Sequence, residues 1–384
     1  MRDVDGAVAN HDGNREVPLG RRQAVGRLGG LAVMAALGCH GVRRVDLPAD
    51  DASAAPPPAP DASIRGVLGY AALASSAHNS QPWRVRRESA DRLVLLRDVT
   101  RRLPAVDPAD RELMLSLGAF LENLAQAGTA LGLPCDIVPV EGETDEVATI
   151  HLGAAAPGPT ARRTLDAIRR RRILRSGYRD EAIASDHVAA MLASAGEARF
   201  YARGSREWSL LRDGTIAANR LQAARDDAQR ELASWIRWRD DEVRAKRDGL
   251  TPESLEIGGV AGWWVRRRYT SASVMSPAFR KRGVETAERQ ASAGGGWLVL
   301  TGSGSTRASL LDAGRRYERL LLSLRGLGIA AHPMTQILEE AETRHGLEAS
   351  LGVSETIQFL LRVGYVERYP EPVSVRRPID WFLV

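Results

Sequence analysis

The 384-residue sequence has little cysteine, little lysine and no metal-ligand spacing. Cys39 and Cys135 are its two cysteines, and two cysteines build neither a disulfide framework nor a zinc site. The seven histidines show neither the H-x-H nor the H-E-x-x-H pattern. We therefore expect no structural or catalytic metal.

Lys246 and Lys281 are the only lysines, so arginine supplies nearly all of the positive charge. The 53 basic residues are nearly matched by 48 acidic ones, which gives a formal net charge of +5. A nucleic-acid-binding surface needs a basic stripe interleaved with stacking aromatics, whereas the arginines here gather only in short runs. We expect a mixed surface and no nucleic-acid partner.

The N-terminal region lacks an apolar run long enough to span a bilayer as a stable helix. Paired arginines, Arg21 and Arg22, precede a weak apolar stretch over 28–38, which resembles a twin-arginine export signal. Ala36-Leu37-Gly38-Cys39 partly resembles a lipoprotein box, so Cys39 is a candidate lipidation site. The alternative is a chance arginine pair before an alanine-rich stretch.

The layout of the first 63 residues is typical of an exported protein. Residues 1–46 would be the signal, and the Ala-, Pro- and Asp-rich segment 47–63 would be a linker that buries no core. We expect passage through the twin-arginine export machinery. The protein would then be periplasmic or on the cell surface, and membrane-anchored if Cys39 carries a lipid.

Two stretches of the chain repeat each other at a constant offset. Residues 118–133 and 314–329 match in Gly, Glu, Leu and Gly at a spacing of 196 residues, and both are expected to be amphipathic helices. A hydrophobic strand is expected before each, at 92–96 and 297–301. A strand ending in glycine is expected after each, at 149–153 and 359–364. We interpret the chain as two fused copies of one α+β module.

The segment Ser76-Ala-His-Asn-Ser-Gln-Pro-Trp83 gathers small polar side chains between a helical stretch and an extended run. The amides of Asn79 and Gln81 offer donors and an acceptor, so the cluster can read the edge of a flat heterocycle. The alternative is an ordinary helix cap and turn. Pro82 is expected to restrict Gln81 to extended geometry and so to stiffen the turn.

Arginines and tryptophans form two further groups. The run 169–175 closes a helix expected over 160–168, and its guanidiniums either grip a phosphate or form a solvated helix end. Residues 216–247 carry apolar side chains at helical spacing. The segment 249–262 is expected to be a loop that can act as a lid. Four tryptophans near this region are either core or a roof over a flat ligand: Trp235, Trp238, Trp263 and Trp264.

In this order the motifs resemble the nitroreductase superfamily, and most of all its tandem, Acg-like branch of flavin-binding oxidoreductases. The resemblance covers most of residues 64–384. It is carried by Ser76–Trp83, Asp107-Pro-x-x-Arg111-Glu112 with Ser116-Leu-Gly118, the arginine run 169–175, His332-Pro-Met-Thr-Gln336 with Glu339, Thr343 and Arg344, and Leu361-Arg-Val-Gly364 with Arg376-Arg377-Pro378.

The resemblance implies an α+β, nitroreductase-like fold in which two fused modules mimic the usual homodimer, with mixed sheets flanked by helices. The modules would be 64–159 and 160–384, and the second would contain a helical or lid insertion at about 216–290. FMN would bind between the modules. The repeat then implies a second, pseudo-symmetric pocket that lacks the Ser76–Trp83 string, and we expect that pocket not to function.

The resemblance also assigns residues to the flavin. Three would meet the isoalloxazine or ribityl edge: Ser76, Asn79 and Gln81. Five would meet the phosphate or the ring: Arg171, Arg172, Arg175, Arg376 and Arg377. Three would line the other side of the flavin: Pro333, Met334 and Gln336. Three are substrate-side or lid candidates: Trp263, Trp264 and His332. No catalytic side chain is expected, because flavin N5 carries the hydride.

The arginine run departs from the family motif. Ile173 stands where the family has Ser or Thr, and Leu174 where the tandem branch often has Asn, so two polar contacts to FMN are missing. We predict two-electron reduction of a flat, electron-poor acceptor such as a nitroaromatic or a quinone, with NAD(P)H or a quinol as donor. The alternatives are a flavin-binding or flavin-lost protein that sequesters a ligand without turnover, and a structural or stress protein without a ligand.

Overall fold

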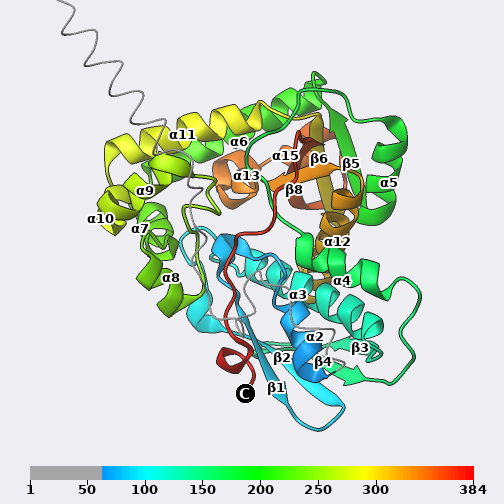
Figure 1. The fold of residues 1–384 in the computed structure, drawn as a ribbon. Helices are drawn as coiled ribbons and strands as arrows, with labels where there is room; N and C mark the ends of the chain where they lie inside the picture. The colour runs from blue at the N-terminus through cyan, green and yellow to red at the C-terminus, as the bar shows by residue number, and fades with distance from the viewer. Residues whose placement is uncertain (1–62) are drawn as a thin grey trace, which may run out of the picture. The chain divides into compact units, whose positions relative to one another are not determined.

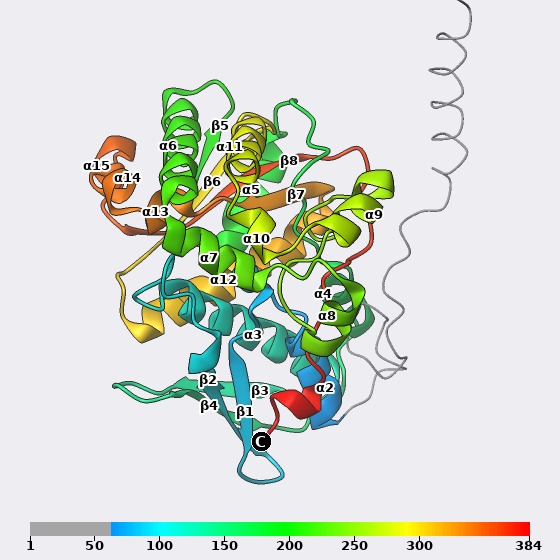
Figure 2. The same ribbon diagram turned by 90° about the vertical axis from the view of Figure 1, so that its left-hand side faces the viewer.

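The computed structural model describes residues 63–384. The predicted export signal, its arginine pair and Cys39 lie outside the described residues. Within 63–384 no helix is both long and apolar enough to cross a membrane. In space, two β-sheets lie at opposite ends of the described structure, and the helices α3 and α12 lie between them (Figures 1 and 2).

The first module is an antiparallel sheet with one long helix packed on it. Its strands are hydrogen-bonded in the order β1-β2-β4-β3. A short helix precedes the sheet, and the long helix separates β2 from β3. The elements are α2 (Ile64–Ala71), β1 (Trp83–Arg87), β2 (Arg92–Arg97), α3 (Arg111–Ala130), β3 (Cys135–Pro139) and β4 (Glu146–Leu152).

The second module repeats this topology with the strand order β5-β6-β8-β7, again antiparallel. Two helices, α4 (Ala161–Arg170) and α5 (Ser185–Ala195), connect it to the first module. The pairing register shifts at matching places, between Leu95 and Leu96 in β2 and between Leu300 and Thr301 in β6. The remaining repeated elements are β5 (Ala198–Ala202), β6 (Gly296–Gly302), α12 (Arg307–Gly326), β7 (Ile329–Pro333) and β8 (Thr356–Tyr365).

The two-module α+β architecture predicted from the repeat is therefore confirmed. The strands expected at 92–96, 149–153, 297–301 and 359–364 are β2, β4, β6 and β8. The sequence prediction missed β3, β5 and β7; β3 and β7 each follow their long helix directly. β3 is short and partly exposed, so it lacks the continuous apolar run that marks a buried strand.

The modules differ in the connection between their first two strands. A hairpin of residues 88–91 joins β1 to β2, whereas six helices of the described chain lie between β5 and β6. The helical stripe expected over 216–247 is divided among three of them, because Arg225 and Ile236 have extended backbones that end a helix. The six are α6 (Arg206–Ala224), α7 (Asp226–Trp235), α8 (Asp240–Lys246), α9 (Gly259–Arg268), α10 (Ser271–Val274) and α11 (Pro277–Ala291).

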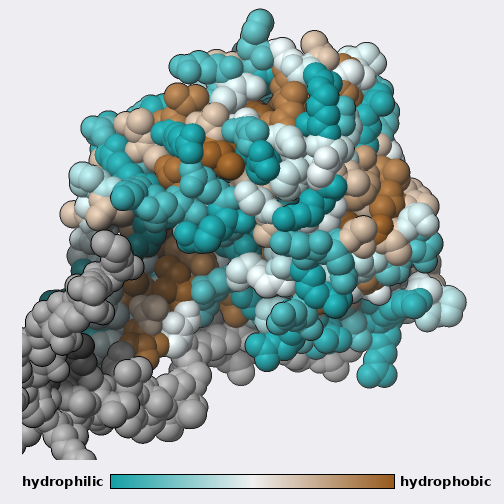
Figure 3. Space-filling model, turned by 90° about the horizontal axis from the view of Figure 1, so that it is seen from above, coloured by the Kyte–Doolittle hydropathy of each residue, from teal (hydrophilic) through white to brown (hydrophobic). Residues whose placement is uncertain are grey.

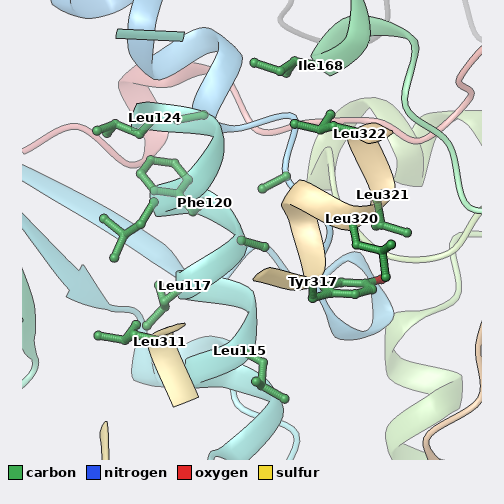
Figure 4. Packing of buried hydrophobic residues seen from close by; sticks show 14 of the residues in the cluster. Leu115, Leu117, Phe120, Leu124, Ile168, Leu311, Tyr317, Leu320, Leu321 and Leu322 are labelled. Carbon is green, nitrogen blue, oxygen red and sulfur yellow. The ribbon is translucent and has the colours of Figure 1, made fainter. Parts of the chain in front are cut away.

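The main hydrophobic core forms where α3 and α12 cross. Side chains from both helices fill this space (Figure 4), and those of Leu117, Phe120 and Leu320 are fully buried. Burying one such side chain stabilises the fold by about 1.5–3 kcal/mol. Both modules contribute to this core cluster, so they fold around a shared interior.

After β8 the chain returns to the first module. Leu383 forms a parallel bridge with Val85 of β1. The backbone N–H of Val85 donates to Phe382 O, and that of Val384 donates to Val85 O, both at 2.7 Å. The red segment that runs down to the first sheet in Figure 1 is this connection. It carries residues 366–384 past the space between the modules.

Large exposed apolar side chains are scattered over the described surface. The face shown in Figure 3 is covered mostly by hydrophilic residues, with hydrophobic ones in small groups. Trp263 and Trp264 of α9 are the two most exposed tryptophans, at 55% and 47%. The last turn of the same helix is rich in arginine, and Arg267 lies over the ring of Trp263.

Candidate functional site

A cavity of about 460 Å³ is lined by residues of both modules. This volume lies within the range of about 300–1,000 Å³ common for cofactor sites. The first module contributes 75–79 and Glu112, and the second contributes 168–173 and segments after β7. Nine of the predicted site residues line the cavity: Ser76, Asn79, Arg171, Arg172, Arg175, His332, Pro333, Gln336 and Arg376.

The turn between α2 and β1 forms one wall in an unusual backbone conformation. His78, Asn79 and Gln81 have φ of 51°, 52° and 53°, the left-handed region that non-glycine residues rarely adopt. The prediction that Pro82 holds Gln81 extended was therefore wrong. Each residue held in this conformation destabilises the fold by about 1–3 kcal/mol, and the conformation persists only where the surrounding structure holds it.

Hydrogen bonds to distant segments fix this turn. The side-chain Nδ2 of Asn79 donates to the carbonyls of Gly249 and Val375, both at 3.1 Å. Its Oδ1 accepts a hydrogen bond from Arg376 Nη1 at 3.1 Å. Asn79 thus joins the first module, the helical insertion and the C-terminal segment at the cavity wall.

The amide of Gln81 lies outside the cavity lining. Gln81 is fully buried; its Nε2 donates to Arg247 O at 2.9 Å, and its Oε1 accepts from the backbone N–H of Arg377 at 2.8 Å. Arg377 in turn donates to the carbonyls of Gln81, Trp83 and Trp381. The structure therefore corrects the prediction that Gln81 and Arg377 bind the ligand, because polar side-chain atoms of both residues are hydrogen-bonded to the protein backbone.

Arg171 lines the cavity, but its charge already has a partner. Its Nε lies 2.9 Å from Glu318 Oε1, and the two side chains are 5% and 0% exposed. Its Nη2 donates to Leu73 O, and the other oxygen of Glu318 accepts from Ser75 Oγ at 2.8 Å. Arg171 is therefore the counter-ion of a buried carboxylate, in addition to any part in holding a ligand.

The other arginines of the wall differ in how far they are engaged. Arg376 donates to Leu73 O, Ala74 O and Asn79 Oδ1, and burial lowers its pKa to about 9. Arg172 donates to Glu371 O at 2.6 Å, and its half-buried guanidinium borders the cavity. A guanidinium offers five donors, so Arg172 retains donors for a ligand.

His332 lies at the cavity between two guanidiniums. Its Nε2 is 3.1 Å from Arg175 Nη1, and its Nδ1 is 3.4 Å from Arg362 Nη2. Burial, with the charges of these two arginines, lowers the pKa of His332 well below its usual range. Its imidazole is therefore neutral and accepts a hydrogen bond from Arg175.

The remaining predicted residues lie away from the cavity lining. Met334 is buried in a separate apolar cluster of the second module, because it points to the opposite side of the chain from Pro333. Trp263 and Trp264 are exposed on α9. Trp238 is core, with edge-on contacts to Tyr269 and Phe279.

Part of the predicted lid does border the cavity. Leu250, Ser254 and Leu255 of the segment 249–262 are among the lining residues. Arg175 Nε donates to Ser254 O at 3.2 Å, and the backbone N–H of Arg175 donates to Glu256 Oε1 at 2.7 Å. This segment is thus held against the arginine run in the structure.

A group of acidic and amide side chains on another wall was not assigned a role from the sequence. Thr335 Oγ1 lies 2.8 Å from Glu112 Oε1 and 2.9 Å from Glu339 Oε1, and Gln222 Nε2 donates to Glu339 Oε2. Burial and the nearby Glu112 raise the pKa of Glu339 to about 8. Residues 112 and 339 are 227 positions apart, and no local pattern signals that they meet.

The pseudo-symmetric position on the other side of the helix crossing is occupied by protein groups. Glu122 corresponds to Glu318 at the 196-residue offset, and it accepts hydrogen bonds from Arg315 and Arg319 at 2.9–3.2 Å. The residues of α3 that correspond to these arginines are Ala119 and Asn123. Glu318 therefore faces no such pair and is free to hold Arg171.

Comparisons with known proteins find several that are similar to this chain. The protein Rv3131 of Mycobacterium tuberculosis H37Rv, provisionally named an NAD(P)H nitroreductase, is 30% identical over 332 residues, covering 84% of this chain and 91% of its own. The similarly named Acg protein of the same strain is 27% identical over 346 residues, covering 83% and 94%. The crystal structure of the FMN-dependent nitroreductase NfnB from Mycobacterium smegmatis with NADPH is 16% identical, covers 53% and 90%, and has a TM-score of 0.33.

No protein-family model matches the sequence. The similarity to Rv3131 nevertheless extends over most of both chains, from the first module to the last. Together with the duplicated α+β module, it shows that the chain belongs to the nitroreductase family.

Proposed function

We propose that the protein is an FMN-dependent oxidoreductase that reduces a flat, electron-poor acceptor such as a nitroaromatic or a quinone. The observation that carries this proposal is the cavity between the modules, whose lining combines guanidinium, amide and carboxyl groups. Relatives in the family carry names that specify NAD(P)H as reductant, which makes NAD(P)H the first donor to test.

The residues present fit a flavin mononucleotide. Arg172 has spare donors for a dianionic phosphate, which guanidiniums bind through paired hydrogen bonds. The side-chain Oε1 of Gln336 is buried, borders the cavity and finds no hydrogen-bond partner within residues 63–384, so it can accept from a ring N–H. When bound, FMN would supply hydride transfer.

The chain's own residues would bind and orient the reactants. Asn79 and Gln336 place amide groups at the wall, and the neutral imidazole of His332 keeps that part of the cavity free of an additional cation. Leu250 and Leu255 cover the cavity with apolar surface that excludes water. Excluding water strengthens each electrostatic contact inside the cavity.

Spectroscopy of the purified protein tests the proposal. We expect flavin absorbance, or uptake of added FMN, bleaching by NAD(P)H or dithionite, and recovery on adding a nitroaromatic. Arg172→Ala should weaken FMN binding by about 1.5–3 kcal/mol, as for a charged hydrogen bond. The control is Arg162→Ala, an exposed arginine of α4 outside the cavity lining. A colourless protein that takes up no FMN would refute the proposal.

The segment 249–255 at the cavity favours one second candidate, a protein that encloses a flavin or another ligand without turnover. Leu250 and Ser254 border the cavity, and Arg175 fixes the segment there. Bound flavin that neither NAD(P)H nor a quinol analogue reduces, although dithionite does, would support this candidate over the first.

We also propose export through the twin-arginine route, on the sequence of residues 1–46 alone. A reporter fused to residues 1–62 should reach the periplasm or cell surface. Replacing Arg21 and Arg22 by lysine should block transport, and Cys39→Ala should release the reporter from the membrane. Transport that survives the lysine replacements would argue against this route.

A further inference from the structure

We propose that Glu339 and Glu112 share one proton through the hydroxyl of Thr335, and that this proton is delivered to the oxygen of the acceptor when it is reduced in the cavity. The inference rests on the proposed function and narrows it. It specifies an acceptor whose reduction takes up a proton at oxygen, such as a nitro group or a quinone. Glu339 would be a catalytic acid, and Glu112 and Thr335 would be positioning residues.

Counting hydrogen bonds shows why a proton must be present. A threonine hydroxyl has one hydrogen to donate, and an ionised carboxylate can only accept. Thr335 Oγ1 is within 2.8 Å of Glu112 Oε1 and 2.9 Å of Glu339 Oε1. If the hydroxyl donates to one carboxylate, the other oxygen can bond to it only by carrying a proton itself.

The surroundings place that proton on Glu339. Arg111 Nη2 lies 3.3 Å from Glu112 Oε1, so a positive charge stands beside that carboxyl group and not beside Glu339. The other oxygen of Glu339 accepts from the neutral amide of Gln222. The chain of donors then runs from the Glu339 carboxyl to the Thr335 hydroxyl and on to the Glu112 carboxylate.

The charged groups packed around the pair are consistent with this assignment. Asp107 precedes α3, and burial together with Glu112 raises its pKa to about 6, so a further anion lies on that side. On the side of the helical insertion, Arg225 forms an ion pair with Glu340 Oε1 at 2.7 Å. The charge of Arg225 is therefore balanced by Glu340 and not by Glu339. His78 faces Glu112 from the turn, and burial lowers its pKa to about 4, so it is neutral.

The three residues of the relay face the place where a substrate would lie. Glu112, Thr335 and Glu339 all line the cavity, next to Gln336 and Pro333. In the proposed step the O–H bond of Glu339 breaks as an O–H bond forms on the acceptor. The acceptor would receive two electrons as hydride from the reduced cofactor, which would thereby be oxidised, and the Glu339 carboxylate would regain its proton from water.

The first test needs no flavin. Urea unfolding of the flavin-free protein is followed between pH 6.5 and 9 for the wild type, Glu339→Gln and the control Glu342→Gln, whose side chain is exposed on α14 (Ala341–Arg344). A carboxyl with a raised folded pKa stabilises the fold at low pH, and this stability is lost as pH rises through about 8. The urea midpoint of the wild type and of Glu342→Gln should fall over this range more than that of Glu339→Gln.

The glutamine of Glu339→Gln can donate to Thr335 and accept from Gln222, so this variant should fold. Glu112→Gln removes the neighbouring negative charge and should move the wild-type transition to lower pH. Identical pH profiles for the wild type, Glu339→Gln and Glu112→Gln would overturn the shared proton.

The second test compares acceptors in the flavin-loaded protein. Glu339→Gln should slow reduction of a quinone or nitroaromatic by about tenfold or more, since general acids contribute about 10²–10⁴-fold. Reduction of ferricyanide, which takes single electrons and no proton, should be unchanged, and Glu342→Gln should match the wild type with both. Equal loss with both acceptors, or no loss with either, would overturn the catalytic role.

The two tests separate the inference from the proposed function. A protein that binds no FMN fails the proposed function, and the catalytic role of Glu339 fails with it. The unfolding profiles still decide whether the proton is shared. A shared proton together with normal turnover by Glu339→Gln would leave the proposed function standing and reject Glu339 as the acid.

Discussion

Gly118 of α3 and Gly314 of α12 face each other where the two helices cross. A Cβ atom on Gly118 would lie 2.2 Å from Leu311 O, and one on Gly314 would lie 2.1 Å from Leu115 O. Both glycines and both leucines are related by the 196-residue offset of the repeat. The crossing is therefore a pseudo-two-fold contact, and its closeness explains why glycine stands at the same place in both copies.

We expect Gly118→Ala to destabilise the protein by about 1–3 kcal/mol or more, because the added methyl group meets backbone that only a shift of the whole helix can relieve. Urea or thermal unfolding measures the loss. Gly326→Ala is the matched control, since no atom lies within 4 Å of its added Cβ. It should be neutral or stabilising by about 0.4–1 kcal/mol. Equal effects of the two changes would contradict the close crossing.

Arg171→Ala should reduce the free energy of unfolding by about 3–5 kcal/mol, because it leaves the fully buried Glu318 without its counter-ion. Adding Glu318→Gln to this variant should restore part of the loss. Arg170→Ala is the control, since its pair with Glu371 is exposed and contributes less than about 1 kcal/mol. If Arg171→Ala weakened FMN binding but left stability unchanged, the counter-ion role would be wrong.

Stability should fall as pH drops below about 6.5. His332 has a folded pKa well below its usual value, so protons bind the unfolded chain first and favour unfolding. His332→Gln, which still accepts from Arg175, should make the acid-induced loss of stability smaller. The exposed His151→Gln should leave it unchanged. Unfolding curves between pH 4 and 7 measure the difference, and indistinguishable curves for all three proteins would refute it.

One flavin should bind per chain. Around Glu122 the pseudo-symmetric position is occupied by Arg315 and Arg319, whereas the corresponding residues of α3 are Ala119 and Asn123 and Glu318 pairs with Arg171 instead. Titrating the flavin-free protein with FMN and following fluorescence quenching gives the number of sites. A stoichiometry of two per chain would show that the second position is functional.

Some site residues could be predicted from the sequence and others could not. The turn 76–83 and the run 169–175 were singled out because polar groups cluster within a few positions, and both border the cavity. The sequence could not predict which of their polar atoms remain available to bind a ligand. The side-chain amide of Gln81, for example, is hydrogen-bonded to the backbone at residues 247 and 377. Left-handed φ at His78 and Asn79 was also unpredictable, since it depends on bonds to residues 170–297 positions away.

The duplicated α+β module can be recognised in the amino-acid sequence, because hydrophobic period, helix-ending glycines and the 196-residue offset are local properties repeated along the chain. The pairing of Arg171 with Glu318 and the meeting of Glu112 and Glu339 at Thr335 depend on the folded chain. These pairs are 147 and 227 positions apart, and their charges are set by burial and by the partner's charge. Neither is encoded within a window of neighbouring residues: the first pair forms within the second module, and the second forms where the two modules meet at the cavity.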